Sequence, residues 1–222
     1  MREIMRAVLW DLDGTAHDTQ KLIISSFEHS IKQLGYPLKS KEEMIKTLGL
    51  PLSECYRVLV PDGNIEALCK LHQEFQRDNP HLVVPFPNTI STISELKKFG
   101  FKNAAVTSRT RESALSNLET TKVGILMDHI IAKEDVRNPK PNPEGIFSAL
   151  NYLQVLSSNA WMIGDSHVDI YAGKAAGTRT IGFTNGDPSE EIIASSPDYL
   201  VDEISQIVPI ILTELKIATN LF

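Results

Sequence analysis

The chain has 222 residues, of which 42% are hydrophobic and 23% charged, and its formal net charge is −6 at pH 7. This composition is typical of a globular protein with its own hydrophobic core, and the negative charge argues against a nucleic-acid or anionic-membrane partner. No apolar run approaches the ~20 residues that span a bilayer, and the first residues lack the features of a secretory signal. We therefore expect a cytoplasmic protein with no nucleic acid and no membrane as partner. The two cysteines, Cys55 and Cys69, are expected to be reduced packing residues.

The first strand is predicted over the apolar residues 7–10, directly before Asp11 and Asp13. The next seventy or so residues have helical spacing. A first helix covers the apolar residues from 22 to 34, Ser40 has capping-box spacing ahead of a second, and Ser53 is the expected cap of a third. A fourth helix stops before Pro80. Residues 16–83 are therefore predicted to form a four-helix unit.

From residue 84 the pattern alternates between strand and helix, which indicates a parallel sheet with crossover helices. Residues 83–87, VVPFP, are the expected return linker. Further strands are predicted at residues 103–106, 129–132, 160–163 and 180–183, with an edge strand at 199–201. The predicted fold is α/β, with a Rossmann-like parallel sheet core formed by residues 1–15 and 84–222 and the helical domain, residues 16–83, inserted into it.

Candidate functional residues stand where the predicted strands end, because ligands of α/β sheets bind beyond the carboxyl ends of the strands. Four such groups follow in chain order: Asp11 and Asp13, Thr107 and Ser108, Lys140, and Asp165 with Asp169.

The two aspartates at the end of the first strand imply a cation. Residues i and i+2 of an extended segment point the same way, so Asp11 and Asp13 are expected to face one site, where two carboxylates repel each other. Mg²⁺ prefers oxygen ligands and usually takes one or two carboxylates, waters and a substrate phosphate. Asp165 follows Gly164 at a neighbouring strand end and can supply a further carboxylate.

The other strand ends suit a phosphate. A carboxylate can attack phosphorus, and a second acid beside it can protonate the leaving oxygen and later deprotonate water. Thr107 offers a hydroxyl, and with Ser108 it is expected to open a helix whose free N–H groups favour a phosphate. Lys140 lies in a loop stiffened by two flanking prolines, with Asn142 as the expected N-cap of the helix that follows.

These residues, in this order, resemble the haloacid dehalogenase superfamily of phosphatases. DLDGT matches its first motif, Thr107 and Ser108 its second, Lys140 in KPNPEG its third and GDSHVD its fourth. The helical insertion after the first motif is similar to the small helical cap of that family. Residues 163–186, IGDSHVDIYAGKAAGTRTIGFTNG, look particularly like its phosphoglycolate phosphatase branch.

The resemblance implies a role for each matched residue. Asp11 is the implied nucleophile, Asp13 the general acid and base, and Thr107, Ser108 and Lys140 bind the substrate phosphate. The implied metal ligands are the Asp11 side chain, the Asp13 main-chain carbonyl and the Asp165 side chain. Gly14 and Asp169 support the site, and Asp169 either holds the metal waters or pairs with Lys140.

Substrate choice is the least determined property. DGTAHDT places Ala16 and His17 where relatives of this branch usually read DGTLxDS, and Asn88 stands where a glycine is common. His17 and Arg109 are candidates for contact with a second anionic group of the substrate, and Arg57 is a weaker candidate in the helical unit.

The expected function is a Mg²⁺-dependent phosphatase that hydrolyses a small phosphorylated metabolite through an aspartyl phosphate, similar to phosphoglycolate phosphatase, as a monomer or homodimer. The alternatives are an inorganic pyrophosphatase, a sugar phosphomutase, a haloalkanoic acid dehalogenase and a non-catalytic regulatory protein that keeps the fold. Ile23 stands about where the mutase would need a histidine, and Asp13 argues against the dehalogenase.

Overall fold

The computed structural model of the chain describes residues 5–48 and 50–219, with side chains as far as residue 215. Its contacts divide the chain into two compact units, Met1–Asp18 with Pro85–Phe222 and Thr19–Val84. We call the first the core unit and the second the helical unit. The predicted boundaries, 15/16 and 83/84, lie close to this division.

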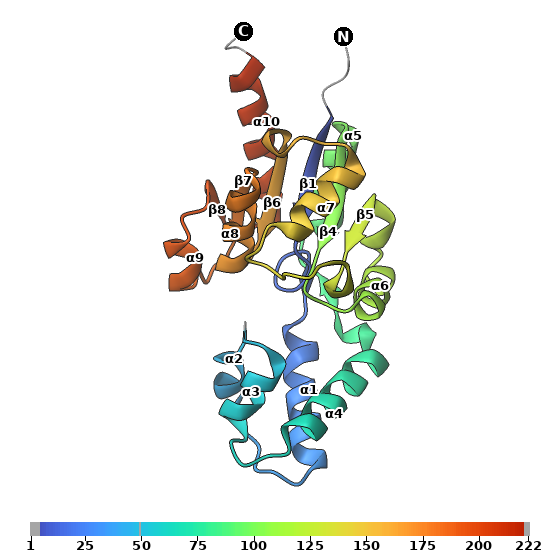
Figure 1. Cartoon of the computed structure of the whole chain (residues 1–222), viewed down its shortest axis with the longest axis vertical. Coiled ribbons are helices and arrows are strands. Elements are labelled where there is room, and N and C mark those ends of the chain that lie inside the picture. The colour runs from blue at the N-terminus through green and yellow to red at the C-terminus, as the bar shows by residue number, and fades with distance from the viewer. Residues whose placement is uncertain (1–4, 49, 220–222) are drawn as a thin grey trace. The chain divides into compact units, whose positions relative to one another are not determined.

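The core unit is built on a parallel sheet with strand order β5-β4-β1-β6-β7-β8 among the described residues (Figure 1). The strands are β1 Arg6–Trp10, β4 Phe101–Val106, β5 His129–Ile131, β6 Ala160–Gly164, β7 Arg179–Phe183 and β8 Tyr199–Val201. The predicted strands and the α/β class are therefore confirmed, with strand ends moved by one or two residues.

Helices cover both faces of this sheet, as Figure 1 shows for α7 and α8 on one of them. The helices of the core unit are α5 Thr89–Lys98, α6 Arg111–Thr120, α7 Glu144–Leu153, α8 His167–Ala176, α9 Glu190–Ala194 and α10 Ile207–Thr219. Along β1, Ala7 and Leu9 pack with α7 and α8, whereas Val8 and Trp10 pack with α5, α6 and α10. This alternation follows from the two-residue period of a strand, and it buries residues 7–10 of β1 completely.

The end of β1 is fixed by a buried polar contact as well as by packing. Trp10 is fully buried, and its indole Nε1 donates a hydrogen bond of 3.0 Å to Asn103 Oδ1 on β4. Because a buried N–H without a partner is costly, this bond favours one placement of the strand end that precedes Asp11.

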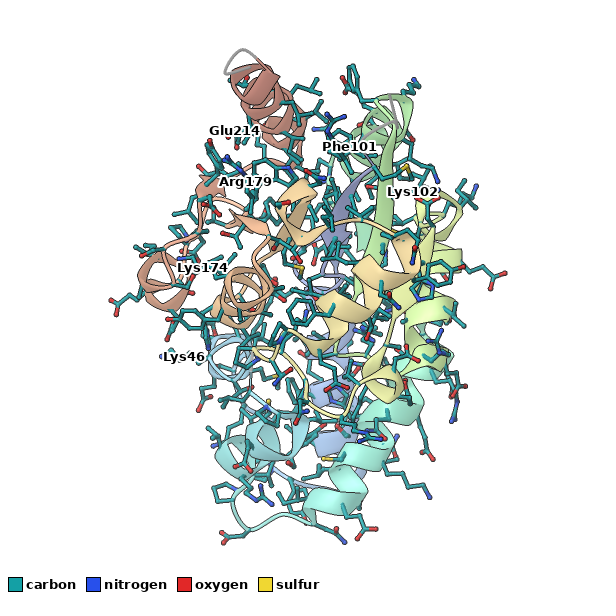
Figure 2. All side chains as sticks on the ribbon, turned by 45° about the horizontal axis from the view of Figure 1, so that its top comes forward. Lys46, Phe101, Lys102, Lys174, Arg179 and Glu214 are labelled. Atoms are coloured by element: carbon teal, nitrogen blue, oxygen red, sulfur yellow. The ribbon has the colours of Figure 1, made fainter. Side chains whose placement is uncertain are left out.

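The last helix is tied to the far strands by charged side chains. Glu214 of α10 pairs with Arg179 of β7 and accepts a hydrogen bond from the Tyr199 hydroxyl of β8. Figure 2 shows Arg179 and Glu214 near each other. The Arg179 guanidinium also lies 5.5 Å from the ring centre of Trp161, within cation–π range.

The helical unit contains α1 Gln20–Gln33, α2 Lys41–Ile45, α3 Leu52–Leu59 and α4 Ile65–Asp78. The capping box predicted at Ser40 is confirmed, since Ser40 and Glu43 exchange hydrogen bonds at the start of α2. The prediction for Ser53 is wrong. Helix α3 begins at Leu52, with Pro51 before it, so Ser53 lies inside the helix. Pro51 occupies the N-cap with φ −54° and ψ 141°, a backbone conformation that proline readily adopts, and the helix starts without a side-chain cap.

A chain of polar groups crosses the interior of the helical unit. The Tyr56 hydroxyl contacts Ser30 Oγ and lies 2.9 Å from His72 Nδ1, and His72 Nε2 lies 2.9 Å from Gln76 Nε2. Tyr56 and His72 are buried, and both rings pack edge-on against Phe27. The chain therefore links α1, α3 and α4.

Both cysteines belong to the helical unit and are unpaired, as predicted. Cys55 is buried, and its thiol donates to the carbonyl oxygen of Thr47 at 3.2 Å.

Two helix starts in the core unit differ from the prediction. Thr107 and Ser108 do not open a helix, because α6 begins at Arg111 with Thr110 as its N-cap. Helix α7 begins at Glu144 after Pro143, one residue later than expected, although Asn142 Oδ1 still accepts the Glu144 N–H at 3.0 Å.

Short strands mark the two crossings between the units. Strand β2, His17–Asp18, pairs with β3, Val84–Pro85, where the sequence predicted only a linker.

Short 3₁₀ helices occupy Pro80–Leu82, Gly124–Leu126, Lys133–Asp135, Ser157–Asn159 and Ile204–Gln206. Among the residues that the structure describes, no helix is long and apolar enough to cross a membrane.

Candidate active site

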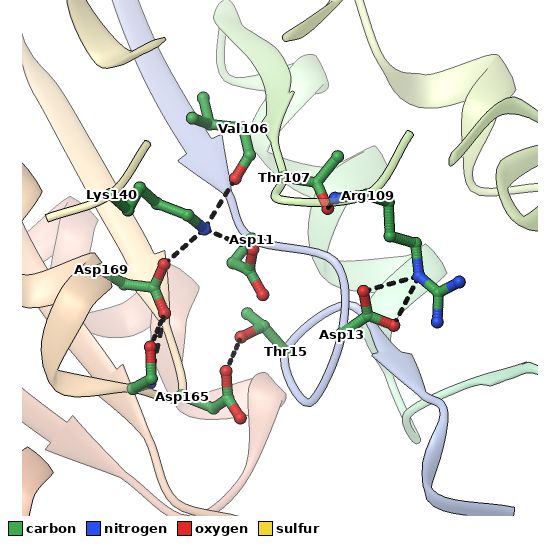
Figure 3. A network of polar contacts seen from close by, with 10 residues as sticks. Asp11, Asp13, Thr15, Val106, Thr107, Arg109, Lys140, Asp165 and Asp169 are labelled. Carbon is green, nitrogen blue, oxygen red and sulfur yellow. Dashed lines mark hydrogen bonds and ion pairs between the residues drawn. The ribbon is translucent and has the colours of Figure 1, made fainter. Parts of the chain in front are cut away.

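A buried lysine joins two carboxylates at the carboxyl end of the sheet (Figure 3). Lys140 Nζ donates to Asp11 Oδ1 at 2.5 Å, to Asp169 Oδ1 at 2.6 Å and to the carbonyl oxygen of Val106 at 3.0 Å. These three bonds use all three N–H donors of the ammonium group, and only 7% of the Lys140 side chain is exposed. The lysine is thus held in one position beside Asp11.

The sheet itself positions Asp11 and Thr107. The Asp11 N–H donates to the Ile163 carbonyl oxygen at 2.9 Å, and the Thr107 N–H donates to that of Ile131 at 2.9 Å. Each bond continues a parallel ladder one residue beyond the end of its strand. Both residues follow the strands as the sequence predicted, and their backbones are as fixed as the sheet.

The loop after Asp11 lies directly against Asp165. Gly14 has φ +76°, and a Cβ at this position would lie 2.0 Å from Asp165 Oδ2. Thr15 Oγ1 donates to Asp165 Oδ1 at 3.3 Å. Only glycine combines the left-handed backbone with the space for this carboxylate, which gives Gly14 its supporting place beside the site.

Asp169 is held from two sides. Its Oδ1 accepts from Lys140, while its Oδ2 accepts from the backbone N–H of Ser166 at 3.2 Å and from the Ser166 hydroxyl at 2.6 Å. The carboxylate packs so closely on the end of β6 that a Cβ on Gly164 would lie 2.4 Å from Asp169 Cγ. Asp169 is therefore a fixed partner of Lys140.

Three carboxylates gather around this point. Ligand oxygens of Asp11, Asp165 and Asp169 all lie within 4.8 Å of one another. Burial raises the pKa of Asp11 to about 7, although Lys140 opposes the shift, and burial also raises the pKa of Asp165 well above its ordinary value. Burial alone lowers the pKa of Lys140, but Asp11 and Asp169 raise it above its ordinary range. The cluster carries more negative charge than one lysine neutralises.

This excess of carboxylate fits a hard divalent cation. Among the described residues Asp165 has no ion pair, and its one hydrogen bond to another side chain comes from Thr15. Both oxygens of Asp169 are already engaged, so Asp11 and Asp165 are the carboxylates better placed to hold a metal. Oxygen donors of this kind are the ligands that Mg²⁺ prefers.

Asp13 does not point to the same group as Asp11, contrary to the expectation from an extended chain. Strand β1 ends at Trp10, and the chain turns over residues 12–16. Asp13 Oδ1 and Oδ2 accept hydrogen bonds from Arg109 Nε at 2.8 and 2.6 Å, as Figure 3 shows. The two aspartates therefore pair with different cations, Asp11 with Lys140 and Asp13 with Arg109.

The side chain of Thr107 is buried next to this group, and Ser108 is exposed. Thr107 Oγ1 accepts the backbone N–H of Arg109 at 3.2 Å, which leaves its own hydroxyl proton to donate. Thr107, Ser108 and Lys140 also line a pocket of about 160 Å³ together with apolar side chains such as Val106 and Ile131.

The structure corrects the expectation for His17. Its side chain is fully buried, and Nε2 lies 2.9 Å from Thr121 Oγ1 inside the core unit, so the imidazole is not open to a substrate. Arg57, the weaker candidate, lies exposed in the helical unit and pairs with Glu54.

Sequence reasoning missed the groups that hold the candidate residues in place. Ser113, which accepts from Arg109 NH1 at 2.8 Å, carries no pattern that marks it. Ser166 had such a signal, because Ser166 and Asp169 have the spacing of a capping box.

The chain is similar to known hydrolases. The family model described as haloacid dehalogenase-like hydrolase matches residues 8–183. A Bacillus velezensis protein named pyrophosphatase PpaX is 32% identical over 206 residues, which cover 92% of this chain and 95% of that protein.

Solved structures are similar over almost the whole chain. A Bacteroides fragilis protein described as haloacid dehalogenase-like superposes with a TM-score of 0.78 at 28% identity, covering 91% of this chain and 99% of that one. A Haemophilus somnus protein described as a predicted phosphoglycolate phosphatase has a TM-score of 0.83 at 20% identity, covering 95% and 99%, and this likeness concerns the fold alone.

The fold, the carboxylate site and these relatives thus define a hydrolase of the phosphatase type built on a parallel α/β sheet. The chain belongs to the haloacid dehalogenase-like hydrolase family and is an enzyme of the phosphoric ester hydrolase class.

Proposed function

We propose that this enzyme hydrolyses a small phosphorylated metabolite through a phosphoryl group carried on Asp11. The observation that carries the proposal is the buried contact between Lys140 and Asp11, 2.5 Å long, beside a cluster of further carboxylates. A nucleophile fixed by the sheet and bordered by a preorganised cation suits an in-line attack on phosphorus.

In the first step an Asp11 carboxylate oxygen forms a bond to phosphorus while the bond from phosphorus to the leaving oxygen breaks. Asp13 gives a proton to that oxygen. In the second step water attacks phosphorus, Asp13 takes the proton of the water, and the bond to Asp11 breaks to release phosphate. The Thr107 hydroxyl donates to a phosphoryl oxygen. Lys140 donates to another when the phosphoryl group takes the place of one of its present acceptors, and Ser108 supplies further donors.

Mg²⁺ is the proposed cofactor. Asp11 and Asp165 would hold it with their side chains and Asp13 with its main-chain carbonyl, while Asp169 keeps Lys140 in place. The bound cation would neutralise charge between the carboxylates and the phosphate.

The substrate we favour is a small ester of the phosphoglycolate kind, and the second candidate is inorganic pyrophosphate. The second is supported by the name of the Bacillus velezensis relative, pyrophosphatase PpaX. A sugar phosphomutase is less favoured, because Ile23 stands about where it would need a histidine. A small cytoplasmic metabolite also agrees with the expected absence of nucleic-acid and membrane partners.

The test is phosphate release over a panel of metabolites with Mg²⁺ or with EDTA, comparing the wild type with Asp11→Asn. We expect kcat to fall by at least about a thousandfold in the variant. Acid quenching of the wild type should trap a phosphoryl group on the peptide that contains Asp11. The matched control is Asp187→Asn, an exposed aspartate of the core unit, which should keep wild-type activity. Full activity of Asp11→Asn would refute the mechanism.

A further inference from the structure

Arg109 is held in place by its side chain and its backbone. Its Nε contacts both oxygens of Asp13 at 2.8 and 2.6 Å, and NH1 donates to Ser113 Oγ at 2.8 Å. Its backbone N–H donates to Thr107 Oγ1 at 3.2 Å, and its carbonyl oxygen accepts from the Lys133 N–H at 2.8 Å. Only 10% of the side chain is exposed. The Arg109 guanidinium is therefore held in one position within the site.

The two buried cations border the two aspartates from opposite sides. In Figure 3 Lys140 lies beside Asp11, and Arg109 lies beyond Asp13 on the side away from Lys140. Lys140 serves the phosphoryl group that Asp11 attacks. Asp13 is the proposed proton donor to the leaving oxygen, so Arg109 stands where the departing part of the substrate begins.

The mechanism described above gives Arg109 no task, yet burying a guanidinium requires a compensating anion. In the free protein that anion is Asp13. A guanidinium carries five N–H donors in a planar fork that matches the oxygens of a phosphate or carboxylate, so a second anion can replace Asp13 there at little electrostatic loss.

We propose that Arg109 is the specificity-determining residue for the leaving group, and that it selects substrates whose departing part carries its own phosphate or carboxylate. This inference rests on the proposed function. The anionic leaving group takes over the guanidinium from Asp13, and the released Asp13 carboxyl turns to the bridging oxygen. A neutral leaving group cannot make this exchange, so Asp13 stays with Arg109 and the substrate reacts poorly.

Matched substrate pairs test the inference. Pyrophosphate and acetyl phosphate are both anhydrides of phosphate, but before the bond to phosphorus breaks only pyrophosphate carries negative charge on its departing part. Phosphoglycolate and 2-hydroxyethyl phosphate are the matching pair of esters. In Arg109→Gln we expect kcat/KM for the anionic member to fall about 30-fold or more, mainly through KM, because one partner of a buried charge contact is lost. The neutral member should change by less than about fivefold, and Arg109→Lys should lie between wild type and Arg109→Gln.

Arg111→Gln is the matched control, because Arg111 is two residues away, exposed and paired with Asp135. It should leave the ratio between the two members of each pair unchanged. A parallel loss for both members in Arg109→Gln would mean that Arg109 only positions Asp13, and the inference would be wrong. An equal effect of Arg111→Gln would assign the selectivity to general surface charge and would also overturn it.

Binding separates this inference from the proposed function. Calorimetry measures the affinity of the Mg²⁺-loaded protein for a ligand without any turnover. The two ligands are imidodiphosphate, which has two anionic groups, and methylphosphonate, which has one. We expect Arg109→Gln to weaken only the first, by about 30-fold. This contrast can hold even if the wild type hydrolyses neither substrate pair, and equal weakening of both ligands would refute the inference whatever the activity.

Discussion

His17 should make the core unit sensitive to mild acid. Its imidazole is fully buried, Nε2 contacts Thr121, and Nδ1 has no hydrogen-bond partner among the described residues. Burial lowers the pKa of His17 from 6.5 to about 4, with a smaller opposing effect of Asp13 and a smaller reinforcing effect of Arg109. The folded protein therefore keeps this histidine neutral where the unfolded chain would charge it.

The sign and size of the effect follow from linkage. As pH falls below 6.5, the unfolded state binds the proton first, so the contribution of His17 to stability is present above pH 6.5 and is lost as pH falls towards 4. With these two pKa values the loss between pH 7.5 and pH 5 is about 2 kcal/mol, and it approaches about 3 kcal/mol near pH 4.

The assay is urea unfolding at several pH values, comparing the wild type with His17→Gln, which cannot titrate. Trp10 and Trp161 are the two tryptophans of the chain, and both lie in the core unit, so their fluorescence follows that unit alone. The wild type should lose about 2 kcal/mol more than His17→Gln between pH 7.5 and pH 5. The control His81→Gln changes an exposed histidine of the helical unit and should follow the wild type. Parallel curves for the wild type and His17→Gln would refute the reasoning.

Two further predictions concern the carboxylate cluster. In Gly14→Ala the new Cβ would meet Asp165 Oδ2 at 2.0 Å, so we expect the free energy of unfolding to fall by about 2 kcal/mol more than in Gly100→Ala, where φ is also positive but nothing lies within 4 Å. Equal losses in urea unfolding would exclude the contact as the cause. Because Mg²⁺ binds ionised carboxylates and burial raises the pKa of Asp11 to about 7, the increase in Tm on adding Mg²⁺ should be larger at pH 8 than at pH 5.5. Thermal melts check this, and an increase independent of pH, or one that persists in Asp165→Asn, would contradict it.

The parallel sheet and its strand-end residues could be predicted because their signals are local. Short apolar runs such as that of β1 end at polar residues, and in a parallel sheet all carboxyl ends meet at one edge. Asp11, Thr107, Lys140 and Asp169 are therefore brought together although up to 158 positions of sequence separate them.

The partners of these residues were harder to predict because they depend on turns and on distant packing. The turn after Trp10 directs Asp13 to Arg109, 96 positions away, and no local pattern reports that turn. His17 is buried by Thr121, 104 positions away, whereas its sequence neighbours suggested an open site. The start of α3 was misplaced because Pro51 takes the N-cap without a side-chain hydrogen bond, so the N-cap preference of Ser53 did not decide the boundary.

The hydrogen bonds that extend the sheet to Asp11 and Thr107 have a consequence for how the enzyme fluctuates. Their amide protons point at the carbonyl oxygens of Ile163 on β6 and Ile131 on the edge strand β5, where each bond adds one step to the end of a parallel ladder. Hydrogen exchange at these two amides therefore requires the ends of these ladders to open, and both amides should be protected more strongly than the N–H groups of the loops around the site. Loops around the site can fray and close on their own timescale while the attacking carboxylate keeps its place, so substrate choice can change in evolution without disturbing the chemistry.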